Sequence, residues 1–307
     1  MYTVIKKYHH NDTLRHSFNQ LAQKTFGLDF EDWYQNGYWG ENYTPYSIVK
    51  DQEIIANVSV NTTNMMWNGK KRKMIQLGTV MTAEAYRNQG LIRKIMEEIE
   101  ADYEGKVDGM YLFANDSVLD FYPKFGFQKA VEYQYSKEIQ KIQNFPQFKE
   151  NAEINPSGSM TLIPMQDKEA WDRLEQIIQA NHHHEKFDMV DNSGLFLFYV
   201  TKFMQESVYY SKELDAYAIA ELEDGELLIH SVFSGKKADL DEKVKLDDVI
   251  LAFGSSVKKV VLGFAPQNPE GYHCEKLYEE DTTLFVKGDV FEEFEAEKLM
   301  FPTLAHA

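Results

Sequence analysis

The chain has 307 residues, 43% of them hydrophobic, with 20 Phe and 18 Tyr, enough apolar material for the cores of two ordinary domains. Its formal net charge of −17 argues against a nucleic-acid partner, which requires a basic surface, and would instead draw cationic substrates such as amines, although solubility alone also accounts for it. Because a single cysteine (Cys274) excludes an intrachain disulfide and no apolar stretch is long enough to span a bilayer, we expect a cytoplasmic protein without a membrane partner.

The first half of the chain alternates predicted strands and helices. Residues 2–8 predict a strand, and the apolar spacing of residues 12–25 predicts a helix. Residues 27–40 predict a short helical or irregular piece, and residues 47–50 and 54–60 predict two strands. Asn68 and Gly69 are typical of a two-residue hairpin turn, which leads into a further strand over residues 74–81.

A tight turn then connects this strand to a predicted helix. Leu91, Ile95 and Ile99 recur at helical spacing, so the helix should begin just after Gly90. A helix N-terminus leaves several backbone N–H groups without partners, with the positive end of the helix dipole behind them, and this combination binds phosphate. Arg87 adds a positive charge, although a plain connection is the alternative for this turn taken alone.

The next elements end in a segment rich in aromatic residues. Residues 108–114 predict a short buried strand that ends at Asn115, and Ser117 can cap a helix over residues 118–125. Gly126 ends this helix, and residues 127–135 predict another extended run.

Two motifs in this order resemble those of the GCN5-related N-acetyltransferase (GNAT) superfamily. Residues 82–92, with Arg87 and Gly90, resemble its acetyl-CoA signature Arg/Gln-x-x-Gly-x-Gly/Ala, although Ile92 stands where a small residue is usual. Residues 115–127, which contain Tyr122, are similar to its later motif Asn…Phe-Tyr-x-Lys-x-Gly-Phe. The resemblance covers residues 1–138 and extends distantly to the Eis-like aminoglycoside acetyltransferases, whose full layout is longer than this chain.

The resemblance implies an α/β (α+β) fold in which helices flank a mixed central sheet, in tandem. It also implies an acyltransferase, an N-acetyltransferase that uses acetyl-CoA as co-substrate and acetylates a primary amine of a small molecule or peptide. A non-catalytic acyl-CoA-binding sensor with the same fold is the alternative, and a structural protein with two degenerate halves is a third. The sequence leaves open the acceptor and the oligomeric state, including a homodimer.

The resemblance further implies how acetyl-CoA is held. The turn would bind the pyrophosphate through backbone N–H groups, and the strand edge before it would pair with the pantetheine amides, with an amide near Val80 polarising the thioester carbonyl. Asn115 would contact the pantetheine arm or a splayed strand. The expected binding residues are Val80, Met81, Thr82, Arg87, Asn88, Gln89, Gly90, Leu91, Ile92 and Asn115.

Tyr122 is the expected general acid, because the motif points to it and a phenol with a pKa of about 10 can protonate a thiolate whose acid has a pKa of about 8.5. The alternative is that this tyrosine only packs. The general base stays open: the family often uses a Glu on the strand before the turn, but residues 73–80 contain none. A carboxylate within residues 31–41, the C-terminal carboxylate of Ala307, or water remain as alternatives.

Aromatic and acidic residues gather in residues 26–46, where they suit a cationic acceptor through charge and cation–π contact. The expected acceptor residues are Trp33, Tyr34, Trp39 and Glu41, and a surface helix with a buried aromatic side is the alternative. We expect no metal site, because the consecutive side chains of His182, His183 and His184 point in different directions.

The composition changes over residues 140–160, where Gln, Asn, Pro, Ser and Gly cluster. We therefore expect a GNAT domain at 1–140, a linker at 141–158 and a second domain at 159–307. The second half repeats the order of strands, helix, strand and Asn, but residues 233–237 lack the phosphate turn. This predicts a degenerate second GNAT-like domain that binds no cofactor, and an unrelated α+β cap is the alternative.

Overall fold

The computed structural model describes residues 2–139, 158–180, 185–234 and 244–306, which divide into two units. Unit 1 holds the residues up to Val131, Tyr278–Glu297 and His306, and unit 2 holds Glu132–Leu277 and Lys298–Ala305. Each unit has a mixed sheet and its own helices, so the expected α/β fold class is confirmed. Within those ranges, no helix combines the length and the apolar character needed to cross a membrane.

The sheet of unit 1 contains one parallel pair among antiparallel neighbours. In sheet order its strands are β1 (Val4–Lys6), β2 (Tyr43–Lys50), β3 (Glu53–Trp67), β4 (Lys70–Thr82), β5 (Gly109–Ala114), β15 (Thr283–Lys287) and β6 (Gln128–Lys129). β4 and β5 run parallel, and the other neighbours along this order run antiparallel. The hairpin predicted at Asn68 and Gly69 joins β3 to β4.

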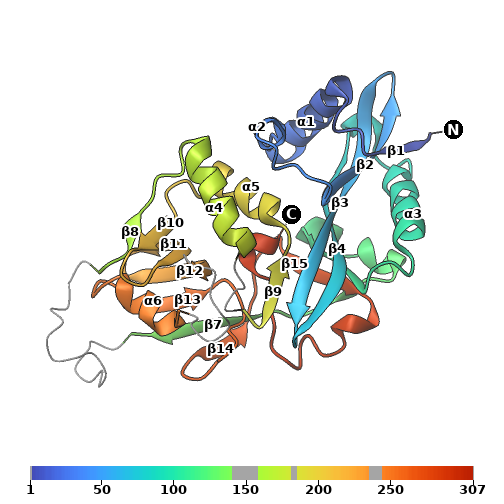
Figure 1. Cartoon of the computed structure of the whole chain (residues 1–307). Coiled ribbons are helices and arrows are strands. Elements are labelled where there is room, and N and C mark those ends of the chain that lie inside the picture. The colour runs from blue at the N-terminus through green and yellow to red at the C-terminus, as the bar shows by residue number, and fades with distance from the viewer. Residues whose placement is uncertain (1, 140–157, 181–184, 235–243, 307) are drawn as a thin grey trace, which may run out of the picture. The chain divides into compact units, whose positions relative to one another are not determined.

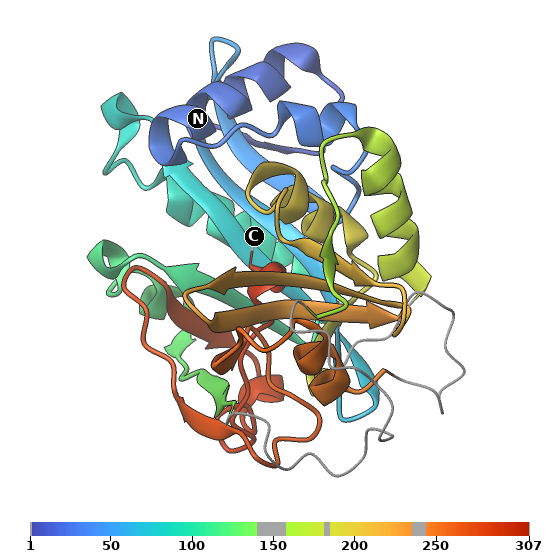
Figure 2. The ribbon, with the colours of Figure 1, turned by 90° about the vertical axis from the view of Figure 1, so that its left-hand side faces the viewer.

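Helices cover both faces of this sheet. Figures 1 and 2 show α1 (Asp12–Phe26) and α2 (Glu31–Gln35) on one side of β2, β3 and β4, and α3 (Leu91–Tyr103) on the other. α1 begins where the Asn11 side chain accepts a hydrogen bond from the Leu14 N–H (3.2 Å), and it ends at Gly27, whose φ of +72° favours glycine. The apolar stripe of α3 packs on the sheet through Leu91, Ile95, Met96 and Ile99.

Unit 2 is built on a second mixed sheet (Figure 1). In sheet order its strands are β14 (His273–Lys276), β7 (Tyr133–Glu138), β13 (Lys259–Leu262), β12 (Glu226–Ser234), β11 (Ala216–Glu223), β10 (Val208–Ser211) and β8 (Thr161–Leu162). β12 and β13 run parallel, and the other neighbours run antiparallel. The unit also contains β9 (Phe187–Val190), α4 (Lys168–Ala180), α5 (Ser193–Lys202) and α6 (Leu246–Ala252).

The two sheets have the same order of parallel and antiparallel neighbours. In each sheet, the strand next to the parallel pair comes from the half of the sequence that supplies most of the other sheet. The parallel pair β4–β5 is followed in its sheet by the antiparallel β15, and the parallel pair β12–β13 is followed by the antiparallel β7. β7 comes directly after β6 in sequence but lies in unit 2, whereas β15 lies in unit 1. The expected domains 1–140 and 159–307 therefore differ from the two units, because β7 belongs to unit 2 and β15 to unit 1. The expected linker 141–158 falls outside the described residues except for Gly158.

The helix predicted over residues 118–125 is wrong. The structure has two 3-10 turns there, Asp116–Val118 and Tyr122–Phe125. Pro123 has no N–H to donate, and its ring disfavours helical backbone at the residue before it, so one continuous α-helix does not form. The predicted extended run over 127–135 is also divided, because its two parts, β6 and β7, belong to different sheets.

Candidate active site

The turn between β4 and α3 is exposed and contains two left-handed residues. β4 ends at Thr82, a 3-10 turn covers Glu84–Tyr86, and α3 begins at Leu91, as its apolar spacing predicts. Asn88 has a φ of +61° and Gly90 a φ of +74°, a region that Asn and Gly tolerate best. A Cβ built on Gly90 would meet no atom within 4 Å, so the backbone conformation requires glycine and the space in front of it is open.

The N-terminus of α3 lacks the partners that the chain supplies to α1. Gly90 has no side chain with which to cap the helix, and the first turn of α3 contains no acidic residue. α1, in contrast, is capped by Asn11 and carries Asp12 in its first turn. Arg87 before the turn and Arg93 within the helix are exposed cations. Unpaired N–H groups, the helix dipole and these charges together favour an anion here.

β4 and β5 separate before either strand ends. Their parallel pairing stops at Gln76 opposite Tyr111, while β4 continues to Thr82 and β5 to Ala114. On its other side β4 stays paired with β3 as far as Thr82. The last part of β4, which contains the expected residues Val80, Met81 and Thr82, thus has a backbone edge that no described strand covers. An extended ligand with amide groups can pair with such an edge.

A β-bulge lies at the start of this free edge. The register against β3 shifts so that Thr79 and Val80 both lie opposite the stretch between Asn57 and Ser59. Thr79 has a φ of +47°, which is strained for a β-branched residue. Sequence reasoning missed this bulge, but Gly78 could have indicated it, since an isolated glycine inside a predicted strand is typical of one.

Neighbouring side chains hold Tyr122 and Asn115, the two residues expected from the later motif, in place. Tyr122 is 5% exposed, its ring packs with those of Phe121, Phe127 and Phe285, and burial raises its pKa to about 12. The side-chain oxygen of Asn115 accepts hydrogen bonds from the backbone N–H (3.0 Å) and hydroxyl (2.7 Å) of Ser117, which fixes its orientation at the end of β5.

The residues expected to bind the acceptor do not share one environment. Trp33 and Trp39 are each 4% exposed and stack in an aromatic cluster with Phe18, Phe30 and Tyr43. Their position therefore gives them a packing role, as in the alternative interpretation of this segment. Tyr34 is half-buried, and Glu41 is exposed, where it pairs with Lys7 at 3.7 Å.

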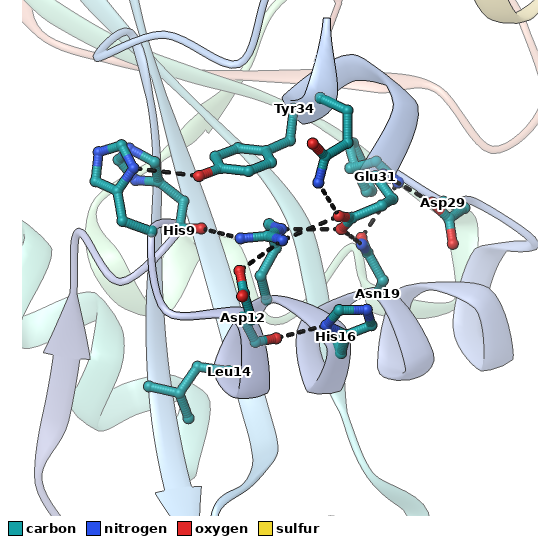
Figure 3. A network of polar contacts seen from close by, with 12 residues as sticks. His9, Asp12, Leu14, His16, Asn19, Asp29, Glu31 and Tyr34 are labelled. Atoms are coloured by element: carbon teal, nitrogen blue, oxygen red, sulfur yellow. Dashed lines mark hydrogen bonds and ion pairs between the residues drawn. The ribbon is translucent and has the colours of Figure 1, made fainter. Parts of the chain in front are cut away.

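A buried arginine holds α1 against α2 (Figure 3). The Arg15 side chain is 2% exposed and donates to both carboxylate oxygens of Glu31 (2.9 and 3.0 Å) and to the His9 carbonyl (2.8 Å). It also pairs with Asp12 (2.9 Å) and lies 3.9 Å from the centre of the Tyr34 ring. Sequence reasoning missed Arg15, although its spacing from Phe18 and Ala22 indicates a place on the buried face of the helix.

Replacing Arg15 with methionine should lower the free energy of unfolding at pH 7 by about 3 kcal/mol, because Glu31, 26% exposed, loses its partner. The Arg15 guanidinium lowers the pKa of Glu31 in the folded protein. The ion pair therefore stabilises the fold fully above the pKa of a free glutamate, about 4.3, and this stabilisation is lost as the pH falls through the lower pKa of Glu31 in the folded protein. Urea denaturation should therefore show the difference from wild type shrinking at acid pH. The matched control is Arg173→Met, since Arg173 is 69% exposed and should matter little.

Other expectations for the site stay untested. Ala307 and the histidines at 182–184 lie outside the described residues, and no acidic residue occurs on β4. Among the residues whose placement is given, no group of three or more His, Cys, Asp or Glu side chains could hold a metal ion. The general base therefore remains open between a carboxylate from elsewhere and water.

Comparisons with known proteins concern the family of one part of the chain and the fold of both units. Residues 9–130 match the family model described as an acetyltransferase (GNAT) domain, which confirms the expected resemblance for this part of the chain. No curated protein sequence matches the chain.

Solved structures similar to this chain include a probable N-acyltransferase from Enterococcus faecalis V583, with a TM-score of 0.56, 16% identity, and coverage of 96% of this chain and 74% of that one. They also include Eis1 from Mycobacterium abscessus (TM-score 0.55, 14% identity, 92% and 73% covered). A GCN5-related N-acetyltransferase from Kribbella flavida is a third (TM-score 0.53, 13% identity, 94% and 72% covered). At these identities the likeness concerns the fold, and it extends across both units.

Proposed function

We propose that this protein transfers an acetyl group from acetyl-CoA to a primary amine of a small molecule or peptide, because residues 9–130 match the family model of an acetyltransferase (GNAT) domain. The observation that carries the proposal is the juxtaposition in unit 1 of an uncapped α3 N-terminus with the unpaired end of β4. The first suits a pyrophosphate, and the second suits the amide-containing arm that connects it to the thioester.

The proposed reaction forms one bond and breaks another. The lone pair of a neutral amine attacks the thioester carbonyl carbon, an N–C bond forms, and the C–S bond breaks with its electron pair leaving on sulfur. The thiolate takes a proton from Tyr122, which regains one from solvent, and the amine nitrogen gives up a proton to a base or water. The products are an amide and free coenzyme A.

Each part of the site has a proposed role in this step. Backbone N–H groups at residues 88–92, with Arg87, would hold the pyrophosphate, and Val80–Thr82 with Asn115 would hold the pantetheine arm. The Val80 N–H would polarise the thioester carbonyl as charge develops on its oxygen. Of the expected acceptor residues, Tyr34 and Glu41 have exposed surface and stay in the proposal as acceptor contacts.

Unit 2 is proposed to be a degenerate GNAT-like domain that binds no acetyl-CoA. Its support is the shared connectivity of the two sheets, in which β12–β13 corresponds to β4–β5. The segment that would correspond to the phosphate turn includes residues 235–243, which lie outside the described residues, and it contains no Arg-x-x-Gly-x-Gly pattern.

A non-catalytic acyl-CoA-binding protein is the second candidate function. Two observations favour it: β4 carries no carboxylate that could act as base, and burial raises the pKa of Tyr122 to about 12, well above that of a thiol. Such a protein would use the same turn and strand edge to bind the ligand without transferring the acyl group.

Titration calorimetry and a turnover assay separate these functions. Coenzyme A should bind the full chain with a Kd between about 1 μM and 1 mM, and thiol release from acetyl-CoA should rise with one or more amines of a panel. Binding without amine-dependent thiol release would favour the sensor, and the absence of any heat would overturn both candidate functions.

A further inference from the structure

We infer that Asn57 is a positioning residue that fixes the orientation of the Thr79–Val80 peptide and so directs the Val80 N–H toward the free edge of β4. The inference rests on the proposed function, because the Val80 N–H is the group expected to meet the thioester oxygen. It concerns a residue on the neighbouring strand β3 that does not reach the ligand itself.

Asn57 uses its whole side chain to hold the bulge. It is 0% exposed, and its Nδ2 donates to the Thr79 carbonyl (2.9 Å) and to the Ser59 hydroxyl (2.9 Å). Its Oδ1 accepts a hydrogen bond from the Ser47 hydroxyl (2.7 Å), which in turn lies 2.7 Å from the Tyr8 hydroxyl. The Asn57 amide therefore has a fixed orientation, with its donor directed at the Thr79 carbonyl.

The Thr79 carbonyl determines the direction of the next N–H. The peptide bond between Thr79 and Val80 is trans, so its C=O and N–H point in opposite directions. Since the carbonyl points toward Asn57 on β3, the Val80 N–H points away from β3, toward the side on which β5 has separated.

The regular pairing of β4 with β3 beyond the bulge gives the same direction for the Val80 N–H. The Ala83 N–H donates to the Ile55 carbonyl on β3 (2.9 Å), and Met81 is paired with Asn57. Backbone groups of successive strand residues alternate sides, so those of Val80 and Thr82 face away from β3. Two independent observations thus give the Val80 N–H the same orientation.

The bulge explains why the Thr79 carbonyl needs a side-chain donor such as Asn57. A bulge removes one backbone carbonyl from the β-ladder, and a buried carbonyl needs another donor. Thr79 is further held by its hydroxyl, which lies 2.7 Å from that of Tyr43. If the peptide turned over, its carbonyl would occupy the edge where negative charge develops on the thioester oxygen, and that arrangement would oppose catalysis.

Asn57→Asp tests the inference without changing the shape of the side chain. At pH 8 the introduced carboxylate has no hydrogen to donate to the Thr79 carbonyl, so kcat for acetyl transfer should fall about 10²-fold to 10³-fold, the loss typical of a missing oxyanion donor. The Kd for coenzyme A should change less than about threefold, because the pyrophosphate turn is untouched.

The pH profile gives a readout that a merely structural role would not produce. Burial raises the pKa of a carboxyl, and the protonated carboxyl group of the Asn57→Asp variant can donate to Thr79 again, so the ratio of variant to wild-type kcat should rise as pH falls. The titratable groups in the same chain of contacts are Tyr8 and Tyr43; burial raises the pKa of both, that of Tyr43 to about 12, so neither interferes below pH 8.

Two further variants keep the test decisive. Ser47→Ala removes the hydrogen bond that orients Asn57 and should lower kcat about tenfold with unchanged coenzyme A affinity. Ser231→Ala removes a comparable buried hydrogen bond, from Ser231 to Glu185 (3.0 Å) in unit 2, and should leave kcat unchanged. Wild-type kcat in both folded Asn57→Asp and Ser47→Ala proteins would overturn the inference, and should Asn57→Asp not fold, Ser47→Ala decides alone.

Amide exchange tests the orientation apart from turnover. In protein labelled with 15N-valine, the Val80 amide should exchange with solvent faster than those of Val58 and Val60, which are 0% exposed on β3. An equally slow Val80 amide would contradict the inference even in an active enzyme. Absence of coenzyme A binding by the wild type, with a fast Val80 amide, would instead remove the proposed function and leave the orientation supported.

Discussion

Gly90→Val should weaken coenzyme A binding at least about 100-fold. Valine is β-branched and strained at a φ of +74°, which costs on the order of 1–3 kcal/mol, and its methyl groups would fill the open space in front of the first N–H groups of α3. Because a Cβ at this position meets no atom of the protein within 4 Å, the variant should still fold. Titration calorimetry with coenzyme A measures the loss directly.

Gly105→Val is the matched control for this variant. Gly105 has a φ of +65°, and a Cβ there also meets nothing within 4 Å, but it lies just beyond the C-terminal end of α3. Its replacement should produce a similar backbone strain and a similar fall in thermal stability while leaving coenzyme A affinity intact. Equal affinity of both variants for coenzyme A would show that the anion does not bind at the start of α3.

The elements of the candidate site that depend on local signals could be predicted from the sequence. Asn11 before α1, Gly27 after it, and the apolar spacing of α3 determine helix ends through contacts within a few residues. The turn at Arg87 to Gly90 belongs to the same group, because a left-handed residue and a helix N-terminus are both encoded within one short stretch.

The exchange of β7 and β15 could not be predicted in this way. β7 alternates between tyrosine and polar residues, whereas β15 is a short apolar run that is buried at its centre, and neither pattern distinguishes the partner strands. The choice depends on contacts between residues far apart in sequence: Phe285 on β15 packs in the core of unit 1 with Leu112 of β5, although more than half the chain separates them.

Buried polar side chains are the other part that sequence reasoning missed. The spacing of Arg15 indicates the buried face of its helix, but nothing in the sequence identifies Glu31 and the His9 carbonyl as its partners, or the Thr79 carbonyl as the partner of Asn57. Trp33 and Trp39 show the reverse difference: their neighbouring acids resemble a binding surface, whereas each side chain is 4% exposed, and their role toward an acceptor stays a prediction. Burial is a property of the assembled unit, so composition alone does not determine it.

Tyr122→Phe should lower kcat for acetyl transfer about 10²-fold and leave coenzyme A affinity unchanged. The ring would keep its packing against Phe121, Phe127 and Phe285, and only the hydroxyl would be lost. General acids are typically worth about 10²-fold to 10⁴-fold, and we expect the low end, because an acid whose pKa is about 12 gives its proton to a thiolate uphill.

The pH profile and a second tyrosine decide whether Tyr122 donates that proton. With a pKa of about 12, Tyr122 stays mostly protonated up to about pH 11, so the wild-type kcat should show no fall from its ionisation below that pH. Tyr135 is also 5% exposed, and Tyr135→Phe removes a hydroxyl that donates to the Lys298 carbonyl (3.0 Å), which should cost stability but not turnover. If both variants retain the wild-type kcat, the thiolate leaves without help from Tyr122, and the phenol serves only the packing of the core.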